Sequence, residues 1–337
     1  MRRATIALLL LGVLLGPGTG SEDRIPRTST QNGIVHGTHF LRINESAELS
    51  ALIPEDIAAS AIRWYVALPI AEDYNNYLYC GEHPAKGCHQ PIHYRLRELR
   101  EVRGRLSFDL KSIHAFASPG TYLIGILTGS GDTLCGRDIA ELEAQRLFKL
   151  VIRRDNTYVG YLTELFGVPF VLWPQRLLGR GHQTDLQIGA DCVALVIYGR
   201  RRMGFEVPYV APPALSRFMT VVDNAADTGG RRVRVGDVLN FGFQTAVVAE
   251  DREPVGVLSD NDLIIHTYHG AAEEIPFSRL PYRNHPFEIL RWSPTMLGRL
   301  VSKTSASSSR SKIRDVDAAS FHPGANNQAE RIDGGPE

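Results

Sequence analysis

Hydrophobic and polar positions alternate in short segments between residues 36 and 154, and turn residues separate these segments. A period of two is typical of a β-strand that buries one face. The pattern predicts four strands in this region: Ala61–Leu68, Leu106–Leu110, Thr121–Leu127 and Leu147–Arg153. Several strands at turn-punctuated spacing favour two packed antiparallel sheets, so residues 36–154 are predicted to form an all-β sandwich domain.

The pattern changes near Asp155, where helical segments begin. One predicted helix spans Tyr158–Phe166. A second begins at Cys192, ends near Gly204 and is apolar on almost every side, which is typical of a helix buried inside a domain. A third is predicted over Ala214–Val222, and five strands follow: Val238–Phe241, Thr245–Ala249, Asp262–His266, Glu274–Phe277 and Phe287–Trp292. Helices followed by antiparallel strands indicate an α+β domain, assigned to residues 155–300.

The two ends of the chain differ from these domains. Residues 1–20 consist of a basic N-terminal segment, the apolar run Ile6–Leu15 and the small residues of Gly16–Gly20. This order predicts a secretory signal peptide. The apolar run is shorter than the roughly 20 residues that span a bilayer, so we expect an exported protein, periplasmic or extracellular, without a membrane span. Residues 21–35 are predicted to be a linker. Residues 301–337, rich in Ser, Arg, Asn and Gly, are predicted to be a disordered tail.

The charge balance and the cysteine content bear on whether the protein binds nucleic acid, a metal or a cofactor. The 37 basic and 37 acidic residues balance, which gives no reason to expect a nucleic-acid partner. In an oxidising compartment two of Cys80, Cys88 and Cys135 are expected to pair, and Cys192, which lies alone in the C-terminal half, is a candidate for a free thiol. A zinc site in the same segment would use side chains whose spacing fits no standard pattern: Cys80, His83, Cys88 and His89. We therefore expect no metal and no organic cofactor.

The dipeptide Asp191-Cys192 carries the candidate chemistry. Asp191 is placed to cap the buried helix, because its carboxylate can accept the backbone N–H groups of the first turn. Cys192 falls in that first turn, where the helix dipole favours a thiolate. A thiol at the start of a central helix is how cysteine hydrolases present their nucleophile. The alternative is an ordinary buried core cysteine.

The segment from Tyr158 to Trp292 resembles the NlpC family of bacterial cell-wall cysteine peptidases. The matching pieces are Leu165–Phe170, Asp191-Cys192, Gly236–Leu239, Ile265–Thr267 and Phe287–Trp292. The resemblance implies a papain-like α+β fold, Cys192 as nucleophile, and acyl transfer on an amide of a peptidoglycan stem peptide. In the first domain, the turn Pro119–Tyr122 and the strand carrying Trp64 resemble immunoglobulin-like modules, which implies a packing or binding role with a partner that the sequence does not identify.

The family's catalytic base is a histidine at the start of the strand after Gly236–Leu239, and here Gln244 takes that position, with a one-residue uncertainty towards Thr245. Glutamine cannot accept the thiol proton. His266 matches the family's third polar residue, which orients the base. Three interpretations follow: His266 is itself the base, another histidine (His182 or His269) serves, or the domain has lost turnover and binds. Trp173, Gln175 and Gln183 are candidates to line the cleft.

These observations predict an exported cysteine hydrolase acting through Cys192, Gln244 and His266 on peptidoglycan or another cell-envelope peptide. The alternative is an inactive NlpC-like relative that serves as a cell-envelope binding protein. A third interpretation is a secreted structural protein whose likeness to the family is accidental.

Overall fold

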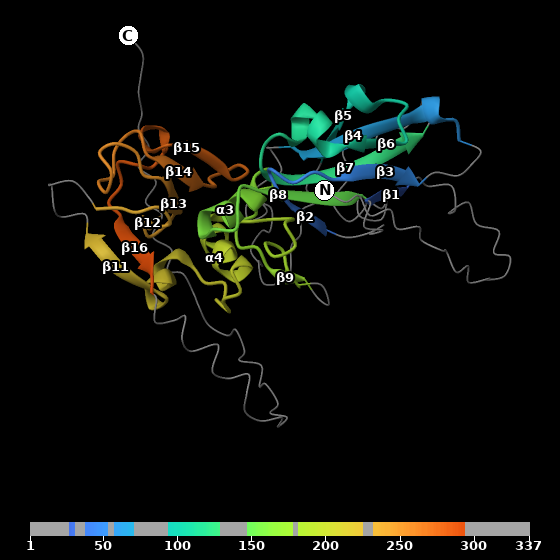
Figure 1. The fold of residues 1–337 in the computed structure, drawn as a ribbon. Coiled ribbons are helices and arrows are strands. Elements are labelled where there is room, and N and C mark those ends of the chain that lie inside the picture. Colours follow the sequence, from blue (N-terminus) through green and yellow to red (C-terminus); the bar gives the residue numbers. More distant parts are fainter. Residues whose placement is uncertain are drawn as a thin grey trace, which may run out of the picture.

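The computed structural model describes residues 27–30, 38–52, 57–70, 94–128, 147–177, 181–224 and 232–293. The predicted signal peptide and tail, and Cys80, Cys88 and Cys135, lie outside these residues. Strands dominate the fold and helices are few (Figure 1). No helix within the described part of the chain is long and apolar enough to cross a bilayer.

Strands from the N-terminal half form two sheets. The larger has the order β2-β8-β7-β4-β5, in which β2 and β8 are parallel and all other pairs are antiparallel. The smaller has the order β1-β3-β6. The bounds are β1 Arg27–Thr30, β2 Thr38–Arg42, β3 Glu48–Leu52, β4 Ile62–Pro69, β5 Tyr94–Glu98, β6 Ser107–Asp109, β7 Gly120–Thr128 and β8 Phe148–Arg153. The four strands predicted at the positions of β4, β6, β7 and β8 are therefore confirmed, each end to within one residue.

The two sheets share one hydrophobic core, to which β4 and β6 contribute their largest side chains. Trp64 of β4 is fully buried, and its ring meets Phe108 of β6 edge-to-face at 4.9 Å. The Trp64 indole donates a hydrogen bond to the Arg105 carbonyl at 2.8 Å, which satisfies its one polar group. Alternation places Ile62, Trp64 and Val66 on the same face of β4, and all three belong to this core.

The C-terminal half places the helix α4 on a six-stranded antiparallel sheet. Its elements are α3 Tyr158–Leu162, β9 Arg176–Leu177, β10 Gly181–His182, α4 Cys192–Arg202, β11 Met219–Asn224, β12 Val238–Asn240, β13 Thr245–Glu250, β14 Leu263–His266, β15 Glu273–Pro276 and β16 Glu288–Trp292. The sheet has the order β11-β16-β12-β13-β14-β15, and β9 and β10 form a separate hairpin. The helix starting at Cys192 and the strands β12 to β16 were predicted from sequence and are confirmed.

The two faces of this sheet are distinct because successive residues point to opposite sides. Val238, Val247 and Ile265 belong to the hydrophobic cluster that contains α4. Leu239, Ala246 and Ile264 belong to a second cluster on the opposite face. A shift of one position along a strand therefore decides whether a polar residue lies on the α4 face of the sheet or on the opposite face.

The predicted helix Ala214–Val222 is wrong. Residues Pro212–Arg217 form a 3-10 helix, and Met219–Asn224 form the edge strand β11, which pairs with β16. Pro212 and Pro213 fix the backbone at the start of the 3-10 turn. The following Thr220-Val221-Val222 run is β-branched, which suits a strand better than a helix.

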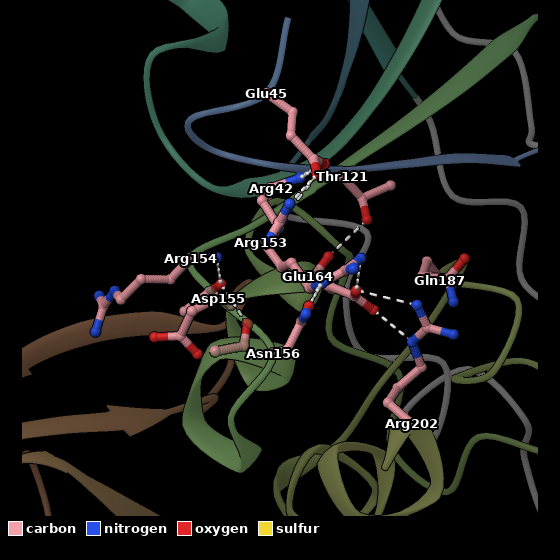
Figure 2. Close-up of polar contacts among 12 residues, drawn as sticks. Arg42, Glu45, Thr121, Arg153, Arg154, Asp155, Asn156, Glu164, Gln187 and Arg202 are labelled. Atoms are coloured by element: carbon pink, nitrogen blue, oxygen red, sulfur yellow. Dashed lines mark hydrogen bonds and ion pairs between the residues drawn. The ribbon is translucent and has the colours of Figure 1, made fainter. Parts of the chain in front are cut away.

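Contacts between the two halves run along β7, β8 and the segment after α3 (Figures 1 and 2). The Thr121 backbone N–H donates to the Phe166 carbonyl at 2.8 Å, and the Thr121 hydroxyl donates to the Glu164 carbonyl at 2.6 Å. Gly120 has φ +148°, and a Cβ there would lie 2.9 Å from the Phe166 carbonyl oxygen, so this approach requires glycine. The Lys149 ammonium donates to the Leu186 carbonyl, which ties β8 to the loop that precedes α4.

Candidate functional site

Asp191 caps α4 as predicted. Its backbone is extended, its Oδ1 accepts the Ala194 N–H at 2.7 Å, and its Oδ2 accepts the Trp173 N–H at 3.1 Å. Burial of the carboxyl group raises its pKa to about 6, and these N–H groups oppose the shift. The same side chain therefore begins the helix and holds the preceding loop against it.

Cys192 is the first residue of α4 and its thiol is buried, with 5% of the residue exposed. Burial raises its pKa to about 12, the adjacent Asp191 carboxylate adds to the rise, and the Thr245 backbone N–H opposes it. The helix dipole alone favours a thiolate, but removal of the sulfur from water outweighs it here. Burial thus favours the neutral thiol over the thiolate.

Cys192 lies at the wall of a cavity of about 310 Å³ that opens between the loop before α4 and the β12–β13 hairpin. Its lining is mostly apolar and aromatic: Leu172, Trp173, Pro174, His182, Asp191, Cys192, Val193, Ala194, Tyr209, Val210, Ala211, Pro212, Phe243 and Gln244. A cavity of this size and composition is within the range of small-ligand sites. The sequence indicated Trp173 as a lining residue, and the structure places it there.

Gln244 and Thr245 occupy the two positions considered for the family's histidine. Gln244 lines the cavity, and its Nε2 donates to the Thr267 carbonyl at 2.5 Å. Thr245 begins β13 on the face turned toward α4, because it is two residues from Val247, and its backbone N–H reaches the Cys192 thiol. Neither side chain can take up a proton from the thiol at neutral pH.

His266 lies on the other face of the sheet. It pairs with Ala246 across β13 and β14, while its neighbour Ile265 faces α4. Its Nδ1 is 3.3 Å from the Tyr282 hydroxyl, and its Nε2 is 3.4 Å from the Glu273 carboxylate. Cys192 and Gln244 thus line one cavity, and His266 does not. The Tyr282 hydroxyl connects the two groups, because it contacts His266 and hydrogen-bonds the Gln244 side chain.

Burial lowers the pKa of His266 to about 4, whereas a histidine in an unfolded chain titrates near about 6.5. The unfolded chain binds this proton more tightly, so the stability contributed by neutral His266 is present above about pH 6.5 and is lost as pH falls toward 4. Between pH 7 and pH 5 we expect the wild-type free energy of unfolding to fall by about 2 kcal/mol more than that of His266→Gln, measured by urea unfolding. Equal pH dependence in the two proteins would contradict a buried, neutral His266.

The other two histidines considered as bases are also engaged. His182 lines the cavity, but its ring stacks on Tyr209 at 3.6 Å and its Nδ1 accepts the Thr184 N–H at 3.3 Å. Burial lowers its pKa to about 4 despite the nearby Asp185 carboxylate. His269 lies in the loop after β14, where its ring contacts Tyr268 and Phe170.

Several residues that sequence reasoning did not select contribute to the cavity. Tyr209 and Phe243 supply aromatic walls, and Pro212 supplies part of the rim. Conversely, Gln183 is buried in the loop, where its Oε1 accepts the Gln175 N–H at 2.8 Å, and neither glutamine lines the cavity. Phe243 sits at a hairpin tip between β12 and β13, and an aromatic residue at an exposed tip is the one signal in the sequence that could have identified it.

Among the described residues, no group of three or more His, Cys, Asp or Glu side chains is close enough to hold a metal ion. The four candidate zinc ligands, Cys80, His83, Cys88 and His89, lie outside those residues. Comparison of the chain with models of protein families, with curated proteins and with solved structures finds no match.

Proposed function

We propose that the protein is an exported, catalytically silent relative of the NlpC-type cysteine peptidases that binds a cell-envelope peptide in the Cys192 cavity. One observation carries the proposal: the Cys192 thiol is buried beside Asp191 and Thr245, which raises its pKa, while His266 does not line the cavity and contacts Tyr282 instead. The chain therefore has a cavity beside Cys192 but no general base positioned to activate the thiol among the described residues.

The arrangement of elements supports the NlpC-like part of the proposal. An Asp-Cys pair begins a buried helix, and that helix packs on an antiparallel sheet whose strands follow it in the sequence. This is the order expected for a papain-like fold. In the N-terminal half, two sheets with one shared core are consistent with an immunoglobulin-like module, which would supply a second binding surface.

An active hydrolase is the competing proposal, and it requires a base beside the thiol. His182 is the one histidine that lines the cavity within the described part of the chain, and its ring is held against Tyr209 with a lowered pKa. A catalytic pair would need an imidazolium that stabilises the thiolate and so raises the histidine pKa. The geometry around Cys192 favours binding over turnover.

The deciding experiment measures the rate of Cys192 alkylation by iodoacetamide against pH in the folded protein, in wild type and His266→Ala. Reaction is followed by mass spectrometry of the peptide that contains Cys192, because the chain has 4 cysteines. We expect slow alkylation that rises only at alkaline pH, with the same profile in both proteins. Unfolding in urea, which exposes the thiol, serves as the positive control and should increase the rate.

Fast alkylation of Cys192 below about pH 7 in the wild type, lost in His266→Ala, would show a thiolate–imidazolium pair. That result would overturn the proposal and support an active hydrolase.

A further inference from the structure

We infer that the Cys192 cavity recognises an uncharged peptide segment through one large apolar side chain. This inference rests on the proposed binding function and specifies its ligand. A stem peptide rich in free carboxylate and ammonium groups would be a poor ligand for such a cavity.

The polar side chains of the cavity are already hydrogen-bonded within the protein. Asp191 accepts two backbone N–H groups, His182 accepts the Thr184 N–H, and the Gln244 amide donates to the Thr267 carbonyl. The Tyr209 hydroxyl donates to the Asp185 carboxylate at 2.7 Å. A ligand whose recognition needed many hydrogen bonds would have to break these contacts, and buried groups left unpaired are costly.

The charge of the lining also selects against ions. Among the described residues that line it there is no lysine or arginine, so these residues offer an anionic ligand no cationic partner, and the Asp191 carboxylate repels it. A cationic ligand is disfavoured as well, because that carboxylate is buried and its two oxygens are directed at the Ala194 and Trp173 N–H groups. Desolvation of an unpaired charge in the cavity would not be recovered in either case.

The walls suit a flat or bulky apolar group. Trp173 and Phe243, which both line the cavity, are 60% and 53% exposed, although rings of this size usually gain by burial. The Trp173 backbone has φ 57°, a left-handed conformation rare for a bulky residue, and its N–H is fixed on Asp191. The volume of about 310 Å³ is also sufficient, because an engineered cavity of about 150 Å³ holds benzene.

Protein NMR can test this ligand class with three blocked amino acids: N-acetyl-phenylalanine amide, N-acetyl-lysine amide and N-acetyl-glutamate amide. The chain has 3 tryptophans, so the Trp173 indole N–H resonance is assigned by its loss in Trp173→Phe. We expect the phenylalanine probe to shift this resonance with saturation, at a Kd at least tenfold lower than that of either charged probe.

Two variants check that the cavity is the site. Ala211 is exposed and lines the cavity, so Ala211→Phe should fill it without disturbing the core and raise the Kd at least tenfold. Val255 is 68% exposed and outside the lining, so Val255→Phe adds the same ring elsewhere and should leave the Kd within twofold.

Tighter or equal binding of a charged probe, an unchanged Kd in Ala211→Phe, or no saturable shift with the phenylalanine probe would each overturn the inference. The alkylation experiment is independent of these outcomes. If Cys192 is reactive and the phenylalanine probe binds, the proposed catalytically silent role is wrong but the proposed ligand class stands. If Cys192 is inert and a charged probe binds more tightly, the silent role stands but the ligand class is wrong.

Discussion

Replacing Glu164 by glutamine is expected to lower the free energy of unfolding by about 3–5 kcal/mol, because the change leaves two arginines facing a buried neutral group. The Glu164 side chain is fully buried. It accepts the Tyr198 hydroxyl at 2.5 Å. It also accepts the Arg202 guanidinium at 2.7 and 3.1 Å, and Arg153 approaches to 3.4 Å (Figure 2). Desolvation of this carboxylate is tolerated only because these donors surround it.

The measurement is urea unfolding at pH 7, with Glu45→Gln as the matched control. Glu45 also pairs with an arginine, Arg42, but both side chains are more than one third exposed. Exposed pairs contribute at most about 1 kcal/mol, so the control should unfold close to wild type. Equal effects of the two substitutions would mean that the Glu164 carboxylate is hydrated in solution.

Glu164 has a further role because its backbone carbonyl accepts the Thr121 hydroxyl from β7. Tyr198 and Arg202 belong to α4, the helix that begins at Cys192. The same residue therefore connects the N-terminal sheet to the helix that forms one wall of the cavity.

The elements with strong local signals were predictable from the sequence. Helix α4 has a capping aspartate and an uninterrupted apolar run, and it ends before Gly204, whose φ of 92° suits a glycine. Strands such as β4 and β7 alternate clearly between polar and apolar positions. Strand β11 was missed because two prolines and a short apolar run do not distinguish a 3-10 turn and edge strand from a helix.

The candidate site was only partly predictable, because strand register decides which residues share a face. Cys192 and Gln244 were identified and both line the cavity. Adjacent residues of a strand point to opposite faces, so His266 and Ile265 lie on different sides of the sheet. Because both residues are buried, the sequence has no polar–apolar alternation that shows which of them faces α4. Glu164 was not singled out, because its partners converge from three distant segments only in the folded chain.

Replacing Trp64 by alanine should have an effect of similar size on the N-terminal half, about 3–5 kcal/mol in the free energy of unfolding. The indole fills the core between β4 and β6, where neighbouring side chains are too well packed to collapse into the space left. Trp64→Phe keeps a ring against Phe108 but loses the hydrogen bond to the Arg105 carbonyl, so it should cost about 1–2 kcal/mol.

Urea unfolding followed by far-ultraviolet circular dichroism separates these cases, with Leu106→Ala as the control for a surface apolar residue that is 48% exposed. That control should remain within about 0.5 kcal/mol of wild type. If the free energy of unfolding of Trp64→Ala were also within about 0.5 kcal/mol of wild type, the two N-terminal sheets would not share a packed core in solution. The proposed immunoglobulin-like module would then lose its structural basis. The expected order of destabilisation, alanine above phenylalanine above the surface control, follows from the burial and the hydrogen bond of Trp64 and requires no assumption about the ligand.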